Sequence, residues 1–374
     1  MLMRQRLKPQ AAHFLLVPEL LYSPPNRAII EALISLGYSV HVFAPGDRPD
    51  TSDYGESVIA HRVDYSMRWV SRHLLEPRWW SFDFFSGTSE DPLAIVGLLS
   101  TITGRPCFSL VDEIKSGSYR GNSPERWKQL CRWAMRRSKF TIVNDDSRIE
   151  LLRHYASLSH NSRVVVYPGC FHKPPQPDPE LRRTLRQSWG LDQDALVIAS
   201  SGAFNLTAGA DWLIQALQED PSLQAVIQPL AVTPLCLFLL RRLGLGRRLY
   251  LQEERLGWQD AWQSAVALDI GLAIYTNPAP QFQHMGTSSN RLCMFLAMGV
   301  PVIATRQASF DFIETYQCGV LVDSYDEFKA AIEHIRNNLS VMRTNCQRCL
   351  HDYIMPSDRW PRLRDAIASL AHKS

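Results

Sequence analysis

The sequence predicts an α/β protein with two parallel, doubly wound sheets, each in a domain of its own. Three observations support this prediction. Strand-like and helix-like segments alternate through the first half of the chain, four prolines then interrupt the alternation at residues 171–180, and the alternation begins again after them. Such alternation is typical of parallel strands joined by helices that cover both faces of a sheet.

The first half of the chain supplies its elements in a regular order. The apolar run HFLLVPEL at 13–20 predicts a strand, the helical spacing of RAIIEALISLGY at 27–38 predicts a helix that ends near Gly37, and SVHVFAP at 39–45 predicts the next strand. The same reasoning predicts helices at 91–104 and 123–138, and strands at 106–113, 139–145 and 163–169.

The second half repeats this rhythm. We expect strands at 195–202, 223–230, 248–252, 269–275, 300–305 and 318–323, and helices at 209–218, 233–244, 258–268, 289–299, from 325 onward and at 357–374. The predicted architecture is two Rossmann-like domains facing across a cleft, where ligands bind outside the carboxyl ends of the strands. The boundaries that we expect are a first domain at 1–172, a proline-rich linker at 173–190, a second domain at 191–354, and a terminal helix at 355–374 that crosses back to the first domain.

Composition excludes several classes of protein. A formal net charge of +3 over 374 residues does not indicate a nucleic-acid partner. Of the 40 basic residues 33 are arginine, which suits phosphate binding but also follows from codon preference. The eight cysteines lie scattered in apolar segments, and the CxxC of Cys346 and Cys349 has no second pair, so we expect a reducing cytoplasm and no metal. The longest apolar runs, such as LCLFLL at 235–240, are too short to span a membrane.

One stretch carries a resemblance to a known family. DIGLAIY at 269–275, a loop, and SSNRLCMFLAMGVPVIAT at 288–305 resemble the nucleotide-sugar site of retaining GT-B glycosyltransferases of the family 4-like group. The positions that fit are Ser289, Asn290, Arg291, Leu292, Ala297, Gly299, Pro301, Val302 and Ile303. Segments 27–45, 136–152, 164–170 and 318–332 resemble further parts of the family in the right order, so the resemblance covers most of the chain.

The resemblance implies a donor site at the start of the predicted helix 289–299. A helix N-terminus presents unpaired N–H groups and a partial positive charge, which makes it an anion site, and in the family these amides hold the diphosphate of the sugar donor. The expected donor-binding residues are Gly202, Phe204, Asn205, Glu253, Tyr275, His284, Gly286, Thr287, Ser288, Ser289, Asn290 and Arg291. The expected catalytic residues are Asp112 and Glu113, adjacent acids at the carboxyl end of a strand.

Four positions depart from the family pattern. Met294 stands where the family usually carries a Glu for the ribose hydroxyls, Gly286 where many members carry a second acid, Ala208 where a phosphate-binding Lys is usual, and Asp112 where a His precedes the acid. Two hypotheses therefore remain. The first is a cytoplasmic glycosyltransferase of polysaccharide biosynthesis that moves a hexose, with retention, from a nucleotide-diphosphate sugar to a glycan or lipid-linked acceptor, without metal or other cofactor. The second is a catalytically inactive GT-B protein that binds glycan or scaffolds a partner transferase.

Two first-domain segments combine arginine with large aromatic residues, at 67–85 and 123–140. Such segments either pack one face against their own core or, with Trp and Arg exposed, line an acceptor groove or contact an anionic membrane at its inner face. We keep both interpretations of these segments.

Overall fold

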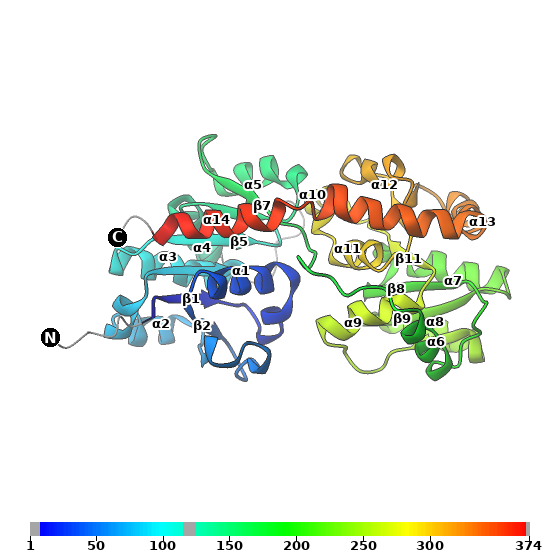
Figure 1. Cartoon of the computed structure of the whole chain (residues 1–374), viewed down its shortest axis with the longest axis horizontal. Helices are drawn as coiled ribbons and strands as arrows, with labels where there is room; N and C mark the ends of the chain where they lie inside the picture. The colour runs from blue at the N-terminus through cyan, green and yellow to red at the C-terminus, as the bar shows by residue number, and fades with distance from the viewer. Residues whose placement is uncertain (1–7, 115–124, 372–374) are drawn as a thin grey trace. The chain divides into compact units, whose positions relative to one another are not determined.

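A computed structural model describes residues 8–114 and 125–371 of the chain, which divides into two compact units (Figure 1). Unit 1 comprises Met1–Phe171 and Ser357–Ser374, and unit 2 comprises His172–Pro356. Each unit contains one sheet of parallel strands with helices on its faces, so the predicted α/β class is confirmed.

Unit 1 contains a seven-stranded sheet in the order β3-β2-β1-β4-β5-β6-β7. Its strands are β1 (Gln10–Phe14), β2 (Ser39–Ala44), β3 (Val58–Arg62), β4 (Phe84–Thr88), β5 (Cys107–Val111), β6 (Thr141–Val143) and β7 (Val164–Val166). Its helices are α1 (Pro24–Ser35), α2 (Met67–His73), α3 (Glu90–Thr103), α4 (Glu125–Arg137), α5 (Ile149–Ala156) and α14 (Arg359–Ala371). The C-terminal helix α14 packs on α1 and β7, so the chain returns to unit 1 as predicted (Figure 1).

Unit 2 contains a six-stranded sheet in the order β10-β9-β8-β11-β12-β13. Its strands are β8 (Val197–Phe204), β9 (Gln224–Val232), β10 (Leu249–Leu251), β11 (Ile270–Ala273), β12 (Val302–Thr305) and β13 (Gly319–Val322). Its helices are α6 (Pro179–Ser188), α7 (Ala210–Glu219), α8 (Pro234–Arg242), α9 (Trp258–Ser264), α10 (Pro280–Gln283), α11 (Asn290–Ala297), α12 (Asp311–Thr315) and α13 (Tyr325–Cys349).

Both sheets reverse their strand order at one place. In unit 1 this switch lies between β1 and β4, and in unit 2 between β8 and β11. At a switch point the connections leave neighbouring strands in opposite directions, so a crevice opens at the carboxyl ends of those two strands. The residues that follow β8 and β11 are therefore the first place to look for a ligand site in unit 2.

The structure differs from the sequence-based prediction in several places, among them strand β3, which was not predicted. Strand β1 ends at Phe14, and Pro18 begins a short 3₁₀ turn within the predicted strand 13–20. Strand β4 lies at the end of the aromatic segment 67–85 and was not predicted. Helix α6 lies inside the stretch predicted as a linker, because Asp178 caps it and a proline in the first turn costs no hydrogen bond.

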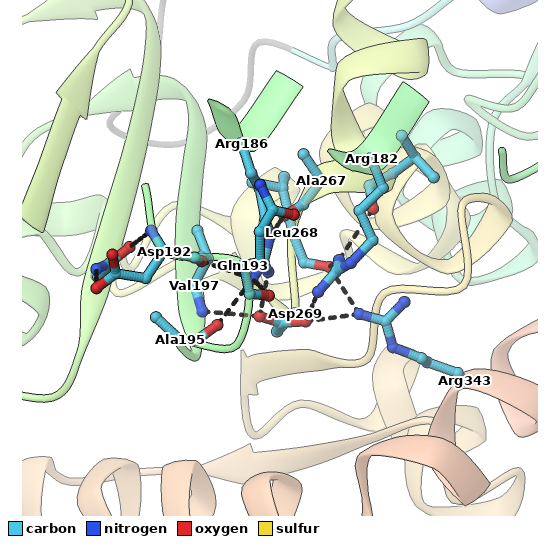
Figure 2. A network of polar contacts seen from close by, with 12 residues as sticks. Arg182, Arg186, Asp192, Gln193, Ala195, Val197, Ala267, Leu268, Asp269 and Arg343 are labelled. Atoms are coloured by element: carbon cyan, nitrogen blue, oxygen red, sulfur yellow. Dashed lines mark hydrogen bonds and ion pairs between the residues drawn. The ribbon is translucent and has the colours of Figure 1, made fainter. Parts of the chain in front are cut away.

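A buried charge network fixes α6 and α13 to the amino edge of the unit 2 sheet (Figure 2). The Asp269 carboxylate lies 2.7 Å from Arg182 Nη2, 2.5 Å from Arg186 Nη2 and 2.6 Å from Arg343 Nη2. It also accepts the Val197 backbone N–H at 2.9 Å, where β8 begins. Burial alone would raise the pKa of Asp269, but Arg186 and the other guanidinium groups hold that pKa below its ordinary value.

Candidate functional site

Four residues meet at the carboxyl edge of the unit 2 sheet, beside the β8/β11 switch point. Gly202 lies in β8, Tyr275 follows β11, and Ser289 and Arg291 lie at the start of α11. A hydrogen bond of 2.6 Å joins the hydroxyl groups of Tyr275 and Ser289. The Arg291 guanidinium lies over the Tyr275 ring, 5.2 Å from its centroid. The sequence had placed all four in the donor site, and the structure brings them together.

Local sequence explains this geometry. Gly202 has a φ of +87°, which favours glycine, and a Cβ added there would lie 3.3 Å from Arg291 Nη2. The absence of a side chain therefore lets the guanidinium lie directly against the backbone of β8. Ser289 caps α11 by accepting the Leu292 N–H at 3.2 Å. The buried residue Phe295 packs α11 against β11 at Gly271, where a Cβ would approach the ring to 2.2 Å.

The start of α11 is positive and incompletely satisfied. Within the described part of the chain, Arg291 Nη1 and Asn290 Oδ1 are buried and have no hydrogen-bond partner. The first backbone hydrogen bond of α11 runs from Cys293 N to Ser289 O at 3.0 Å, so the N–H groups of Asn290 and Arg291 precede the intrahelical ladder. A guanidinium and a helix N-terminus together form a site suited to an anion.

The loop before α11 contributes less than the sequence suggested. The Gly286 N–H donates to Ser309 Oγ at 3.1 Å, and the N–H groups of Ser288 and Ser289 donate to the carbonyls of Met285 and Gly286. Thr287 is buried, and its carbonyl accepts the Cys293 thiol at 3.3 Å. His284 is exposed. The N–H groups of Asn290 and Arg291 are therefore better placed for an anion than those of residues 286–289.

Of three other predicted donor residues, Phe204 and Asn205 lie at the carboxyl end of β8 and Glu253 lies farther away. The Phe204 side chain is buried in the core of unit 2, so a contact between that side chain and the donor is not supported. Asn205 Oδ1 accepts the Thr207 hydroxyl at 2.9 Å. Glu253 is exposed after β10, which lies two strands from β8, or about 10 Å at the usual strand spacing. Met294 and Ala208, at the positions of the usual Glu and Lys, are both buried.

The acids of unit 1 also lie at a carboxyl edge, immediately after β5. Asp112 Oδ1 accepts the Ser89 hydroxyl and the Glu113 N–H, both at 3.0 Å, and the Asp112 carbonyl accepts Arg148 Nη1 at 2.7 Å. Burial raises the pKa of Asp112, and the hydrogen bond from Ser89 opposes that shift. Glu113 is exposed. Hydrogen bonds thus fix the partly buried carboxylate of Asp112, whereas the side chain of Glu113 is accessible to solvent.

Sequence reasoning missed a buried polar network at the β1/β4 switch of unit 1. The fully buried His13 contacts Ser86 Oγ through Nδ1 and Asn26 Oδ1 through Nε2, both at 2.8 Å. Thr88 Oγ1 donates to the same Asn26 oxygen at 2.6 Å. Burial lowers the pKa of His13 to about 4, so the imidazole is neutral at neutral pH. The signal in the sequence was a single histidine at the start of an apolar strand.

The arginine–aromatic segments of unit 1 are mostly core. Trp79, Phe82, Phe84 and Phe85 are all buried, and Trp127 of α4 is buried with them. Trp80 and Leu75 are the large apolar side chains that stay exposed in segment 67–85, at 42% and 71%. The interpretation of these segments as an acceptor groove or membrane surface is therefore not supported for most of their aromatic residues.

No helix among the described residues has the length and apolar character needed to cross a membrane. No group of three His, Cys, Asp or Glu side chains in the described part of the chain is arranged to hold a metal ion.

Solved structures define the class of this protein. Sucrose-phosphate synthase from Thermosynechococcus elongatus aligns with a TM-score of 0.70 and 14% identity over 97% of this chain and 98% of its own. Anabaena HepE in complex with UDP aligns with a TM-score of 0.71 and 16% identity over 98% and 100%. A glycosyltransferase from Rickettsia africae gives 0.70 and 14% over 98% and 100%. The chain therefore has the GT-B fold.

A family model also matches part of the sequence. Residues 258–351 match the family model of the C-terminal domain of glucosyltransferase 3-like proteins, a range that runs from the start of α9 to just beyond the end of α13 and contains Tyr275, Ser289 and Arg291. No match was found among curated protein sequences. The family match and the fold together confirm the sequence-based prediction of a GT-B glycosyltransferase.

Proposed function

We propose that this protein transfers a glucosyl group from UDP-glucose to a glycan or lipid-linked acceptor, in the cytoplasm and with retention of the anomeric configuration. The observation that carries the proposal is the contact of Arg291 with Tyr275 and Gly202 at the start of α11. Two similarities favour this donor: the glucosyltransferase 3-like family model, and Anabaena HepE, whose structure in complex with UDP-glucose aligns at 17% identity. Retention rests on the resemblance of the donor motif alone.

In the proposed reaction the bond between the anomeric carbon and the diphosphate oxygen breaks, and the acceptor hydroxyl forms the new bond to that carbon. Negative charge then grows on the departing diphosphate. The Arg291 guanidinium and the N–H groups at the start of α11 would stabilise that charge without having to reorganise. The acceptor proton must leave its oxygen, and we assign its removal to the adjacent acids of unit 1, of which Glu113 is exposed and Asp112 accepts hydrogen bonds from Ser89 and from the Glu113 N–H.

The inactive alternative rests on the missing Glu and Lys. Arg291 weakens this argument, because its guanidinium lies against Gly202 of β8 and so brings a positive charge to the β8 end without a lysine from the following loop. The ribose would have no carboxylate at Met294, so we expect weak donor binding with catalysis retained. Binding without turnover would instead support the inactive alternative.

A ligand screen tests the proposal. Thermal shift and turnover would be measured with UDP-glucose first, and then with other UDP-, GDP-, TDP-, ADP- and CMP-sugars. A ligand that binds only the native state at a hundred times its Kd stabilises it by about 2.7 kcal/mol, which a melting curve detects. Absence of any shift at millimolar concentrations would overturn the proposal.

A matched pair of glycine variants tests the site itself. Gly202→Ala places a Cβ 3.3 Å from Arg291 Nη2 at φ +87°, and Gly244→Ala also places a Cβ at a positive φ, +58°, with nothing within 4 Å. Both should lose similar stability, but only Gly202→Ala should displace the guanidinium. A charge-assisted hydrogen bond contributes ~1.5–3 kcal/mol, so we expect UDP affinity to fall by about tenfold or more in Gly202→Ala. Equal UDP affinity in the two variants, measured by calorimetry, would refute the assignment of Arg291.

A further inference from the structure

One region of unit 2 exposes an unusual amount of apolar surface. Leu230 at the end of β9 is 60% exposed, and Leu235 and Phe238 of α8 are 54% and 57% exposed. Leu206, just after β8, is 50% exposed, and the Thr233 N–H bonds the Phe204 carbonyl at 3.3 Å, which ties the start of α8 to the end of β8. Apolar side chains that gather in this way, unlike single scattered ones, indicate an interaction surface.

Helix α8 carries apolar residues on its solvent-facing side as well as on its inner side. Its inner face carries the buried residues Cys236 and Leu240, which join the core of unit 2. At 100° per residue Phe238 points directly away from that face, with Leu235 and Arg242 on one side of it and Arg241 on the other. The solvent side of α8 is therefore apolar in its first two turns and basic in its last.

The sequence around α8 is basic, with acids only outside residues 221–252, namely Glu219 and Asp220 before them and Glu253 and Glu254 after them. Between Pro221 and Gln252 the sequence has four arginines, Arg241, Arg242, Arg247 and Arg248, and no aspartate or glutamate. Arg248 donates to the backbone carbonyls of Leu217 and Asp220, but Arg241, Arg242 and Arg247 are exposed. No acidic side chain within the described structure forms a salt bridge with these three arginines. Exposed Leu and Phe beside unneutralised Arg is the pattern of a helix that lies on an anionic lipid surface.

We propose that α8 is a membrane-docking helix, with Leu235 and Phe238 inserted among lipid chains and Arg241, Arg242 and Arg247 on anionic headgroups. This surface belongs to unit 2, and it differs from the arginine–aromatic segments of unit 1, whose aromatic residues are mostly in the core. The occupant is lipid because three free cations beside apolar side chains match the headgroup and acyl layers of an anionic bilayer together. An apolar contact between two copies of this chain would bring the same arginines together and be opposed by their repulsion.

Vesicle co-sedimentation of the full chain tests this proposal. We expect binding to vesicles of phosphatidylcholine with phosphatidylglycerol, little binding to phosphatidylcholine alone, and release at high salt, because the attraction of the arginines is screened. Leu235→Ser with Phe238→Ser should abolish binding. Each of Arg241→Gln and Arg242→Gln should weaken it about fivefold, the usual contribution of one basic residue near an anionic surface.

Matched controls come from the same unit. Val341→Ser removes an apolar side chain that is 63% exposed on α13, and Arg183→Gln removes an exposed charge on α6. Neither should affect vesicle binding by more than a minor amount. All four kinds of variant should keep the wild-type melting curve and UDP-induced shift, so failure of this proposal and failure of the donor assignment are separable.

A fluorescent label on α8 measures separately whether the helix inserts into the lipid. All eight native cysteines are buried, so a polarity-sensitive fluorophore can be attached selectively to Leu235→Cys. We expect a blue shift with anionic vesicles and none with neutral ones. The proposal is overturned if the wild-type chain ignores anionic vesicles at low salt, or if the serine variants bind as well as the controls. It is also overturned if the label shifts only with protein concentration, which would show that a second copy covers α8.

Discussion

Replacement of Asp269 by asparagine tests the buried network of unit 2 (Figure 2). The substitution keeps the size of the side chain and one acceptor oxygen, but removes the negative charge that three guanidinium groups share. Arg186 then stays fully buried with no counterion, while Arg182 and Arg343 keep 23% and 29% exposure and remain partly hydrated. We therefore expect the cost to come mainly from Arg186.

The expected magnitude follows from this burial. Breaking a buried ion pair by removing one partner usually costs ~3–5 kcal/mol, because a charge is left without compensation. Arg186 also donates to the backbone carbonyls of Ala267, Gln193 and Ala195 at 2.8–2.9 Å, and these bonds limit the loss to the lower part of that range. Since a domain is stable by only about 5–15 kcal/mol, unit 2 should become marginal.

Hydrogen exchange resolved by peptide is the best assay, because a chain of two units need not unfold in one step. Peptides from α6, β8 and α13 should open roughly a hundred- to a thousandfold more often in Asp269→Asn. Peptides from unit 1 should be unchanged and serve as the internal reference. The wild-type protection should itself weaken in acid, because the pKa of Asp269 is lowered by folding, so its contribution is complete above about pH 4 and is lost as the pH falls below that.

The control is an exposed pair in the same unit. Arg306 and Asp323 lie 2.9 Å apart with side chains 45% and 56% exposed, so Asp323→Asn should cost less than ~1 kcal/mol. A result for Asp269→Asn no larger than this would refute the reasoning. So would strict additivity of Asp269→Asn and Arg186→Met, because two changes that remove the same ion pair should cost less together than the sum of each alone.

Two further predictions follow from unit 1 and unit 2. Because burial lowers the pKa of His13 from 6.5 to about 4, the unfolded chain takes up a proton in this window and the folded chain does not, so stability should fall by ~3 kcal/mol from pH 6.5 to 4. The free energy of unfolding, measured with urea at several pH values, should change less with pH in His13→Gln than in the wild type. An equal pH dependence in the two proteins would contradict the lowered pKa of His13. Gly319→Ala places a Cβ 2.3 Å from the Val302 carbonyl oxygen of β12 and should cost ~1–3 kcal/mol, whereas Gly257→Ala, with its nearest atom at 3.4 Å, should melt like the wild type.

The fold was predictable from sequence because the central strands are buried on both faces and most covering helices are buried on one. Such burial forces short apolar runs to alternate with amphipathic ones, and this local pattern is visible without any knowledge of contacts. Strand β4 was missed because its apolar residues follow Trp79 and Trp80 without a turn signal, so strand and aromatic surface look alike. Helix α6 is hard to predict because proline usually interrupts a helix. Pro179, however, lies in the first turn of α6, where proline is tolerated.

The networks of side chains were less predictable for a different reason. Asp269 is 74 to 87 positions away from its three arginines, and His13 is 73 positions from Ser86. Neither pairing leaves a periodic pattern, because one polar residue in a buried strand reads the same whether or not a distant partner satisfies it. The cluster of Gly202, Tyr275, Ser289 and Arg291 could be predicted from the sequence only because helix starts and strand ends determine which backbone groups are free. These are local features of the sequence.

In the donor site that we propose, the position of Arg291 would compensate for one departure from the family pattern, the missing lysine. A lysine in the loop after β8 would reach a diphosphate from the sheet, whereas Arg291 reaches the same edge from α11, past a glycine that leaves room for it. Its ring contact with Tyr275, and the bond of Tyr275 to the capping Ser289, restrict the guanidinium before any ligand arrives. A charge held in place in advance costs less entropy on binding than a flexible lysine. The ribose contact has no such substitute, since Met294 is buried and apolar, so selectivity for the nucleotide must come from other contacts than a carboxylate on α11.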